Sequence, residues 1–294
     1  MVQKKEPRIA FFMILPAILV ISVIAFFPLF KTFYDSFFSF SLNPRFPREF
    51  IGFGNYVRLF RDPRFWDALK TTIIFTVVSV TLETILGLMI ALVVHQEFKF
   101  RGAVRAAMLI PWAIPTAISS QMWRWMFNDQ FGIMSRFFEK LHIIEPGTPI
   151  LGRPGLALFA IIQVDVWKTT PFMALLILAG LQLIPEQLYE AAKIDGANML
   201  QRFFRITLPQ LTPTIAVALI FRTLDALRVF DVVYVMTRGS VGTETLSVYN
   251  RVLLMDRAFT SASFGYGSAL SVVIFILISI FAIVYIKSLK LQFE

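Results

Sequence analysis

Six long apolar segments, separated by polar stretches, organise the chain. They run roughly over Ile9–Phe30, Trp66–Val94, Ala103–Phe127, Leu156–Leu183, Thr212–Met236 and Phe264–Ile286. Each is long enough to cross a hydrocarbon layer of about 30 Å at about 1.5 Å per helical residue. Lipid offers the backbone no hydrogen-bond partners, and the short alternating segments of a barrel are not seen. The pattern therefore predicts an all-α, polytopic membrane protein with six transmembrane helices.

The first apolar segment needs a separate decision, because Lys4, Lys5 and Arg8 precede it as they would precede the core of a signal peptide. The apolar run is longer than a typical signal core, and no cleavage pattern of small residues follows it. We therefore expect a retained first span.

Composition supports a membrane protein. Apolar residues make up 57% of the chain and charged residues only 16%, against about 25% charged in soluble domains. The net charge of +9 would suggest nucleic acid in a soluble protein. Here the basic residues lie mostly between the apolar segments, as expected of residues that flank membrane spans. We expect no nucleic-acid partner, and charge alone leaves the orientation in the membrane open.

Motifs for catalysis or metal binding are not seen in the sequence. Cysteine is absent, and His95 and His142 have no second ligand at metal spacing. The sequence contains no phosphate-binding Gly-x4-Gly-Lys-Ser/Thr loop. We therefore expect neither an enzyme nor a metal or cofactor site in this chain, which makes a membrane enzyme the least favoured of the functions considered.

Charged residues inside the apolar segments are the first candidates for a function. In the fifth segment Arg222, Asp225, Arg228 and Asp231 follow one another at intervals of three, a spacing that allows pairing along a helix. One charge at mid-bilayer costs roughly 2.5–3.5 kcal/mol on insertion scales, so these groups must pair or face water. They either lock helices together or line a polar pathway.

Further polar groups lie in the second and fourth segments. Asp165 and Lys168 have the spacing of a similar pair. Glu83 could carry a proton in an ion-coupled carrier, but such a residue more often bonds a neighbouring helix. A carrier often shows repeated halves with matching broken spans, and neither is clear here. Pro111, Pro115 and Pro171 either kink helices around a passage or aid packing.

The polar stretch between the fourth and fifth segments predicts two short helices. Pro185 suits the first position of a helix, and Glu186 favours the positive end of its dipole. One face carries small residues on which a partner could approach closely; it consists of Leu188, Ala191, Ala192 and Asp195.

The end of the first short helix and the start of the second can also be predicted. Gly196 can end the first helix with a positive φ. Asn198 can cap the second, with Gln201 at capping-box spacing. Pro209 is expected to mark the turn into the fifth span.

The same stretch resembles the EAA motif of permease subunits of binding-protein-dependent ABC importers. The match comprises Glu190-Ala191-Ala192, then Gly196, then Ile206-x-Leu208-Pro209. The resemblance implies that the two short helices form a cytoplasmic coupling loop, which docks into a groove of an ATPase and transmits its closure. The implied coupling residues are Glu190, Ala191, Ala192, Asp195, Gly196, Leu208 and Pro209.

Other segments resemble the sugar permeases, in particular their trehalose and maltose branch. They are Ile51–Tyr56, Asp62–Leu69, Arg101-Gly102 with Ile110–Pro115, Val166–Met173 and Phe221–Asp225. The resemblance implies a substrate pathway among the third, fourth and fifth spans, where an aromatic face packs on a sugar ring and polar groups bond its hydroxyls. The pathway residues that the resemblance implies are Trp112, Thr116, Asp165, Thr169 and Arg222, and the charges of Asp225 and Arg228 in the fifth segment make these two further pathway candidates.

The resemblance also implies an assembly. The expected partners are a second homologous permease, two ATPase subunits that bind ATP and Mg, an extracytoplasmic sugar-binding protein and the lipid bilayer. Both termini would lie in the cytoplasm of a multi-pass protein of the cell membrane. The expected regions are 1–66 (tail, first span and external segment), 67–288 (type-1 transmembrane domain) and 289–294 (tail). Which sugar is carried, whether it bears a phosphate, and whether the second permease is different or identical stay open.

Overall fold

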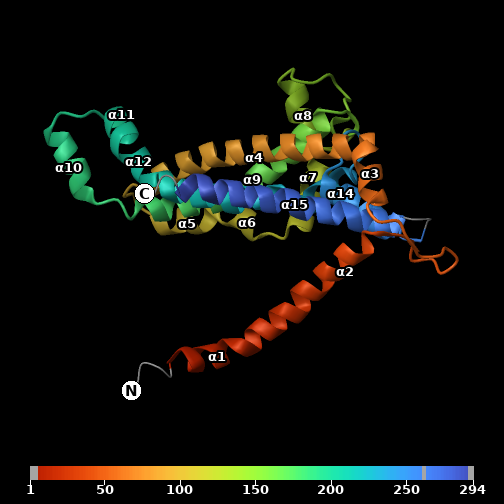
Figure 1. Ribbon diagram of the computed structural model, residues 1–294. Coiled ribbons are helices and arrows are strands. Elements are labelled where there is room, and N and C mark those ends of the chain that lie inside the picture. Colours follow the sequence, from red (N-terminus) through yellow and green to blue (C-terminus); the bar gives the residue numbers. More distant parts are fainter. Residues whose placement is uncertain (1–5, 260–262, 291–294) are drawn as a thin grey trace. The chain divides into compact units, whose positions relative to one another are not determined.

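The computed structural model describes residues 6–259 and 263–290 (Figure 1). Within them, five helices are long and apolar enough to span a membrane, and a bent pair makes up to six. This confirms the all-α, polytopic fold. The chain divides into two compact units, Met1–Pro63 with Asn250–Leu277 and Arg64–Tyr249 with Ile278–Glu294. Residues 1–5 and 291–294, which belong to the expected tails, lie outside the described residues. The boundaries expected for the three regions of the chain remain predictions.

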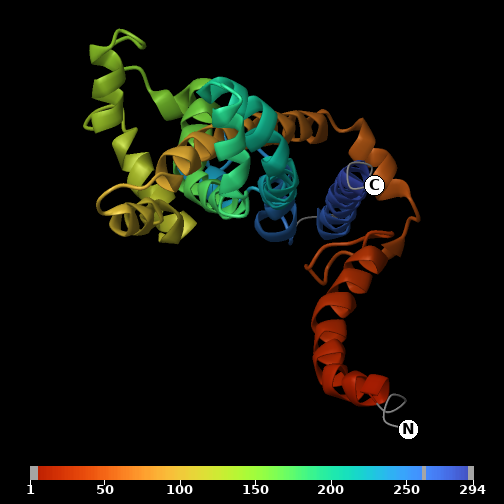
Figure 2. The ribbon, with the colours of Figure 1, turned by 90° about the vertical axis from the view of Figure 1, so that its left-hand side faces the viewer.

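The first span belongs to the first unit and extends beyond its predicted end at Phe30. It consists of α1 (Glu6–Ile21), the π-helical turn η1 (Ser22–Phe26) and α2 (Phe27–Asp35), which Figure 2 shows in red as one curved helix. Pro28 lies in the first turn of α2, where its missing N–H and bulky ring would disturb a regular helix. The wider π turn just before it fits the local adjustment by which helices accommodate proline.

The segment after the first span folds into short elements of the same unit. Two-residue strands β1 (Phe38–Ser39) and β2 (Glu49–Phe50) pair antiparallel, and α3 (Gly54–Arg61) follows. The buried Asn55 amide donates hydrogen bonds to the carbonyls of Ser36 and Phe38, at 2.8 and 2.9 Å. These bonds attach α3 to the end of the first span.

The second unit is built around three helices, α4 (Pro63–His95), α9 (Leu156–Leu181) and α12 (Leu208–Ala226). Two glycines allow close packing at their crossings. A Cβ on Gly87 of α4 would come 2.9 Å from the Met173 side chain of α9. A Cβ on Gly180 of α9 would come 2.6 Å from the Thr214 hydroxyl of α12. Any larger side chain would therefore push these helices apart.

The third span is broken near its prolines. Helices α5 (Arg101–Met108) and α6 (Ile110–Ala113) precede the break, and α7 (Thr116–Met126) follows it at an angle of 87°. Pro115 lies in the break with ψ of 135°, which is extended backbone. Pro115 therefore lies at the bend, whereas Pro111 lies in the first turn of α6 and Pro171 lies inside the continuous α9.

The fifth span differs most from its predicted limits, Thr212–Met236. It runs as one helix over Met199–Ala226, made of α11 (Met199–Arg202), the π turn η3 (Phe203–Thr207) and α12. A break follows, and α13 (Asp231–Thr237) is a separate short helix. The expected turn at Pro209 is therefore wrong: Pro209 occupies the first turn of α12, preceded by a π turn as Pro28 is.

Two hairpins lie at opposite ends of the second unit (Figure 1). At one end are α10 (Glu186–Ile194) and α11, and at the other are α8 (Ile133–Lys140) and the 3-10 turn η2 (Ile150–Gly152). The last described elements are α14 (Leu246–Arg251), the π turn η4 (Val252–Asp256) and α15 (Ser263–Lys290).

Candidate functional site

A buried charged cluster joins the three central helices of the second unit. Arg222 of α12 donates from Nε and Nη2 to the two carboxylate oxygens of Glu83 on α4, with 2.9 Å for the Nη2 bond. Its Nη2 also pairs with Asp165 of α9, and its Nη1 lies 3.1 Å from the Asp225 carboxylate. Glu83 is completely buried, and Arg222 and Asp165 nearly so. One guanidinium thus binds carboxylates from three helices.

The cluster reaches the surface of the unit through Asp225, whose side chain is 69% exposed. The half-buried Thr169 hydroxyl lies 2.6 Å from both the Glu83 carboxylate and the Asp165 carbonyl. The structure therefore brings together four of the predicted pathway residues: Asp165, Thr169, Arg222 and Asp225. Sequence analysis favoured a bond from Glu83 to a neighbouring helix, and this is confirmed. It did not identify Arg222 as the partner.

Apolar layers enclose the cluster along the helix axes. On one side α4, α9 and α13 pack through a core that includes Phe75, Ile161 and Val233. On the other side α4, α9 and α12 pack through Ala91, Ile177, Leu211 and neighbouring residues. Because Glu83, Arg222 and Asp165 are buried, the ion pairs among them are held in a medium of low dielectric.

The spacing of Asp165 and Lys168 predicted an ion pair between them, but this pair does not form. The Lys168 Nζ instead donates to the carbonyls of Trp112, at 3.0 Å, and Ile114, at 2.6 Å. These carbonyls lie at the break in the third span, where helical bonding is interrupted. The ammonium group therefore satisfies backbone acceptors that the proline-induced bend leaves open, while Asp165 pairs with Arg222.

Replacing Lys168 with methionine is expected to loosen this bend. Two hydrogen bonds from a charged donor are lost, each contributing about 1.5–3 kcal/mol, and two carbonyls lose a donor. We expect a lower melting temperature of the detergent-solubilised protein and reduced transport. Lys70→Met removes an exposed lysine of α4 and serves as the control. Equal melting temperatures for the two variants would show that the Lys168 bonds do not stabilise the bend.

The predicted pairing along the fifth span is only partly present. Arg222 pairs with Asp225, but Arg228 lies beyond the end of α12, and its Nε bonds the Leu224 carbonyl at 3.2 Å. Asp231 begins α13, where a carboxylate is favourable near the helix N-terminus. The four charges therefore do not form one ladder, because the helix that would align them ends at Ala226.

The remaining pathway candidates, Trp112 and Thr116, flank the break in the third span. The Trp112 ring stacks on Phe172 of α9, with centroids 5.6 Å apart and an interplanar angle of 12°, and the residue is 47% exposed. Thr116 begins α7, and its carbonyl accepts bonds from the Ser119 and Ser120 hydroxyls. The Lys168 bond to the Trp112 carbonyl links this segment to α9.

The loop between the fourth and fifth spans forms the predicted helical hairpin. Helix α10 starts at Glu186, one position after the predicted Pro185. At its end the Ala197 N–H bonds the Ala192 carbonyl at 2.8 Å, and the Gly196 N–H bonds the Lys193 carbonyl at 3.1 Å. This is a Schellman motif, and Gly196 has φ of +79° as it requires. The predicted helix end at Gly196 is confirmed.

The second helix of the hairpin has the predicted cap. The Asn198 side chain accepts from the Gln201 N–H at 2.9 Å, and the Gln201 side chain accepts from the Asn198 N–H at 2.8 Å. This capping box is therefore confirmed. The Tyr189 hydroxyl, 3.0 Å from the Thr207 hydroxyl, ties α10 to the π turn before α12.

The hairpin exposes apolar side chains at its tip. Ile194 is 87% exposed and Met199 is 72% exposed. No residue of α10 is buried, so the predicted small face around Ala191 stays accessible in this chain. The exposed residues of the predicted coupling set are Glu190, Ala191, Asp195, Gly196 and Pro209; Ala192 and Leu208 are half-buried.

Comparisons with known proteins agree with this architecture. The model of the family of binding-protein-dependent transport system inner membrane components matches residues 83–289. The chain is 46% identical to the trehalose/maltose transport system permease protein MalF of Thermococcus litoralis, over 96% of this chain and 94% of that protein. It is 40% identical to the sulfoquinovosyl glycerol transport system permease protein SmoG of Agrobacterium fabrum, over 96% and 90%.

Two further comparisons extend along nearly the whole chain. The trehalose transport system permease protein SugA of Mycobacterium tuberculosis is 39% identical over 96% of this chain and 89% of that protein. A solved bacterial ABC transporter involved in import of the acidic polysaccharide alginate has a chain with the same fold, with a TM-score of 0.82 at 22% identity, covering 97% and 96%. The family match, the spans and the helical hairpin together place this multi-pass chain among the permease subunits of binding-protein-dependent ABC transporters, the family to which it belongs.

Proposed function

We propose that this chain forms the translocation pathway of an ATP-driven sugar importer, with a disaccharide such as trehalose or maltose as substrate. Relatives at 46% and 39% identity carry trehalose or maltose in their names. The structural observation that carries the proposal is the charged cluster on the central helices. It combines buried ion pairs with one carboxylate, Asp225, that stays exposed.

The cluster and the nearby break in the third span offer groups of the kind that a polyhydroxylated ligand needs. Asp225 supplies exposed acceptors, and the half-buried Thr169 lies beside Glu83. Trp112, at the break, is 47% exposed. Sugars are bound by such a combination of hydrogen-bonding groups and an aromatic face. In this proposal Arg222, which is fully engaged by carboxylates, positions the site, and Asp225 and Thr169 contact the substrate.

The hairpin of α10 and α11 is the proposed contact with an ATPase subunit. Its exposed Ile194 and Met199 would be covered by such a partner, and Glu190 lies on the exposed part of α10. The ATPase pair would bind the ATP and Mg. A second permease and an external binding protein would complete the importer.

The proposed orientation follows from this contact. An ATPase lies in the cytoplasm, so the hairpin of α10 and α11 would be cytoplasmic, and α8, at the opposite end of the unit (Figure 1), would be external. With the bent pair counted as one span, six spans then put both termini in the cytoplasm.

An anionic sugar is the second candidate for the substrate. Arg228 is exposed beside the end of α12 and uses its Nε for the Leu224 carbonyl; among the described residues its terminal N–H groups have no hydrogen-bond acceptor, and they could bind an anion. A relative at 40% identity is named for sulfoquinovosyl glycerol. This observation favours a sugar phosphate or a related anion as the competing substrate.

A pull-down followed by transport measurements tests the function. We expect the tagged chain, extracted in mild detergent from its own cells, to bring an ATPase and a second permease identified by mass spectrometry. The recovered complex, reconstituted with its binding protein, should take up labelled trehalose or maltose only with ATP. If the complex takes up a sugar phosphate but neither trehalose nor maltose, an anionic sugar replaces the neutral disaccharide as the proposed substrate. Recovery of this chain alone, or uptake that collapses with a proton ionophore while ATP is present, would overturn the importer.

A further inference from the structure

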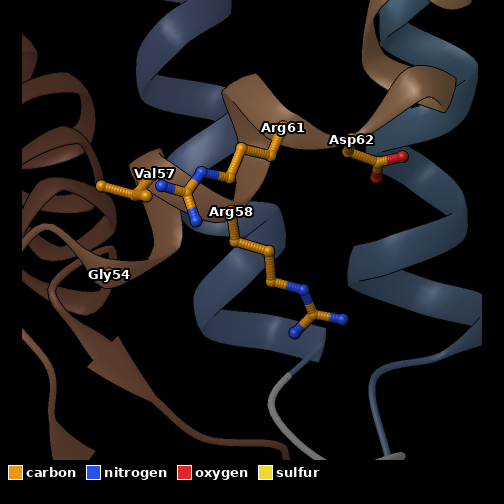
Figure 3. Close-up of a pocket in the computed structure, with 5 residues that line it drawn as sticks. All are labelled: Gly54, Val57, Arg58, Arg61 and Asp62. Carbon is orange, nitrogen blue, oxygen red and sulfur yellow. The ribbon is translucent and has the colours of Figure 1, made fainter.

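A basic groove lies beside α3 in the first unit, remote in sequence from the central cluster. It has a volume of about 550 Å³ and is lined by Gly54, Val57, Arg58, Arg61 and Asp62. Figure 3 shows Arg58 and Arg61 projecting from α3, with the Arg61 side chain extending toward Val57 and Asp62 pointing away. This volume falls within the range of about 300–1,000 Å³ that is usual for small-molecule sites.

The two arginines give the groove a positive charge. Both are exposed and lie one helical turn apart. Within residues 6–259 and 263–290, neither has a carboxylate in an ion pair. The one acidic lining residue, Asp62, accepts a 2.8 Å bond from the Tyr266 hydroxyl. The Arg58 guanidinium lies 4.8 Å from the centre of the Tyr266 ring, which orients it by a cation–π contact.

The position of α3 along the chain indicates that this charge lies near a membrane surface. The helix ends at Arg61, and the long apolar span α4 begins at Pro63, so the arginines lie at the end of a span. Apolar side chains on the same segment are exposed: Phe53 by 69%, Val57 by 49% and Phe60 by 51%. A short helix with exposed aromatic and basic residues is typical of segments that lie in the interface between lipid and water.

We propose that Arg58 and Arg61 bind the phosphate of an anionic phospholipid. Guanidinium groups match phosphate oxygens through parallel N–H bonds. The adjacent Phe53, Val57 and Phe60 would contact the upper part of the acyl chains, which a free phosphate ion lacks. This combination of charge and apolar surface assigns the groove to a lipid headgroup rather than to a soluble anion.

Native mass spectrometry of the full chain tests the proposal. The protein is exchanged into nanodiscs that contain equal amounts of phosphatidylglycerol and phosphatidylcholine, and the lipids that remain bound after release are counted. We expect wild-type protein to retain phosphatidylglycerol preferentially. Arg58→Gln/Arg61→Gln should weaken this retention roughly 10- to 30-fold, as expected for two basic residues near a lipid surface.

The control removes the same charge elsewhere. Arg45→Gln/Arg153→Gln replaces two other exposed arginines and should retain the lipid preference of the wild type. Circular dichroism of both variants confirms that they are folded. Equal retention by the Arg58/Arg61 and the control variants would overturn the site. Displacement of the lipid by millimolar inorganic phosphate, with no preference between lipids, would overturn the lipid assignment in favour of a free anion.

Discussion

Replacing Arg222 with alanine is expected to destabilise the protein by about 3–5 kcal/mol, because removal of one partner leaves buried charges uncompensated. Glu83 and Asp165 both rely on this guanidinium, and each is at least nine-tenths buried. The variant should accumulate poorly in membranes and melt at a lower temperature in detergent. Transport should fall with it.

Two further variants separate structure from transport. Glu83→Gln in the Arg222→Ala background removes one unpaired charge and should restore part of the lost stability, but not uptake. Asp165→Asn leaves the two bonds between Arg222 and Glu83 in place, so uptake should fall more than the melting temperature. Arg228→Ala removes an exposed arginine after α12 and is the stability control. If Arg222→Ala melts like Arg228→Ala, the cluster does not stabilise the helices.

Gly196→Pro is expected to abolish transport while the protein still inserts into the membrane. Gly196 has φ of +79°, whereas proline fixes φ near about −65°. Proline also lacks the N–H that bonds the Lys193 carbonyl. The Schellman turn must therefore open, and α10 can no longer hold its place beside α11. Membrane fractionation and ATP-dependent uptake by the reconstituted importer measure the two parts of this prediction.

The matched control is Gly147→Pro. Gly147 also has a positive φ of +74° and a bonded N–H, here to Glu139, but it lies near α8 at the other end of the unit. Strain should be similar in the two variants, and only Gly196→Pro should lose uptake.

Glu190→Lys, with Gln187→Lys on the same helix as its control, tests the proposed ATPase contact by charge. Normal uptake in both Gly196→Pro and Glu190→Lys would refute a coupling function of the hairpin.

Local features of the fold were the most predictable from sequence. The lengths of the apolar segments predicted the spans, and the Gly196 turn and Asn198 cap depend on neighbouring residues whose chemistry determines the backbone. Pro209 was misjudged because its effect depends on the preceding turn. A π turn over Phe203–Thr207 keeps the helix continuous where a proline was expected to mark a turn.

The charged cluster was harder to predict, because its bonds join residues far apart in the sequence. Spacing of three residues correctly indicated Arg222 with Asp225, but it also indicated Asp165 with Lys168. Tertiary packing gave each of these another partner: Arg222 for Asp165, and the carbonyls of the broken third span for Lys168. One signal was available in the sequence, since Glu83 is an isolated acid in an apolar span and such a group needs a cation nearby.

The continuous helix over Met199–Ala226 has a mechanical consequence. At about 1.5 Å per residue, its 28 residues form a rod of roughly 42 Å. One end belongs to the hairpin and is tied to α10 by Tyr189 and Thr207. Near the other end is Arg222, bound to α4 and α9. A tilt imposed at the hairpin would therefore act as a torque on the ion pairs, and the rod would deliver it without an intervening hinge.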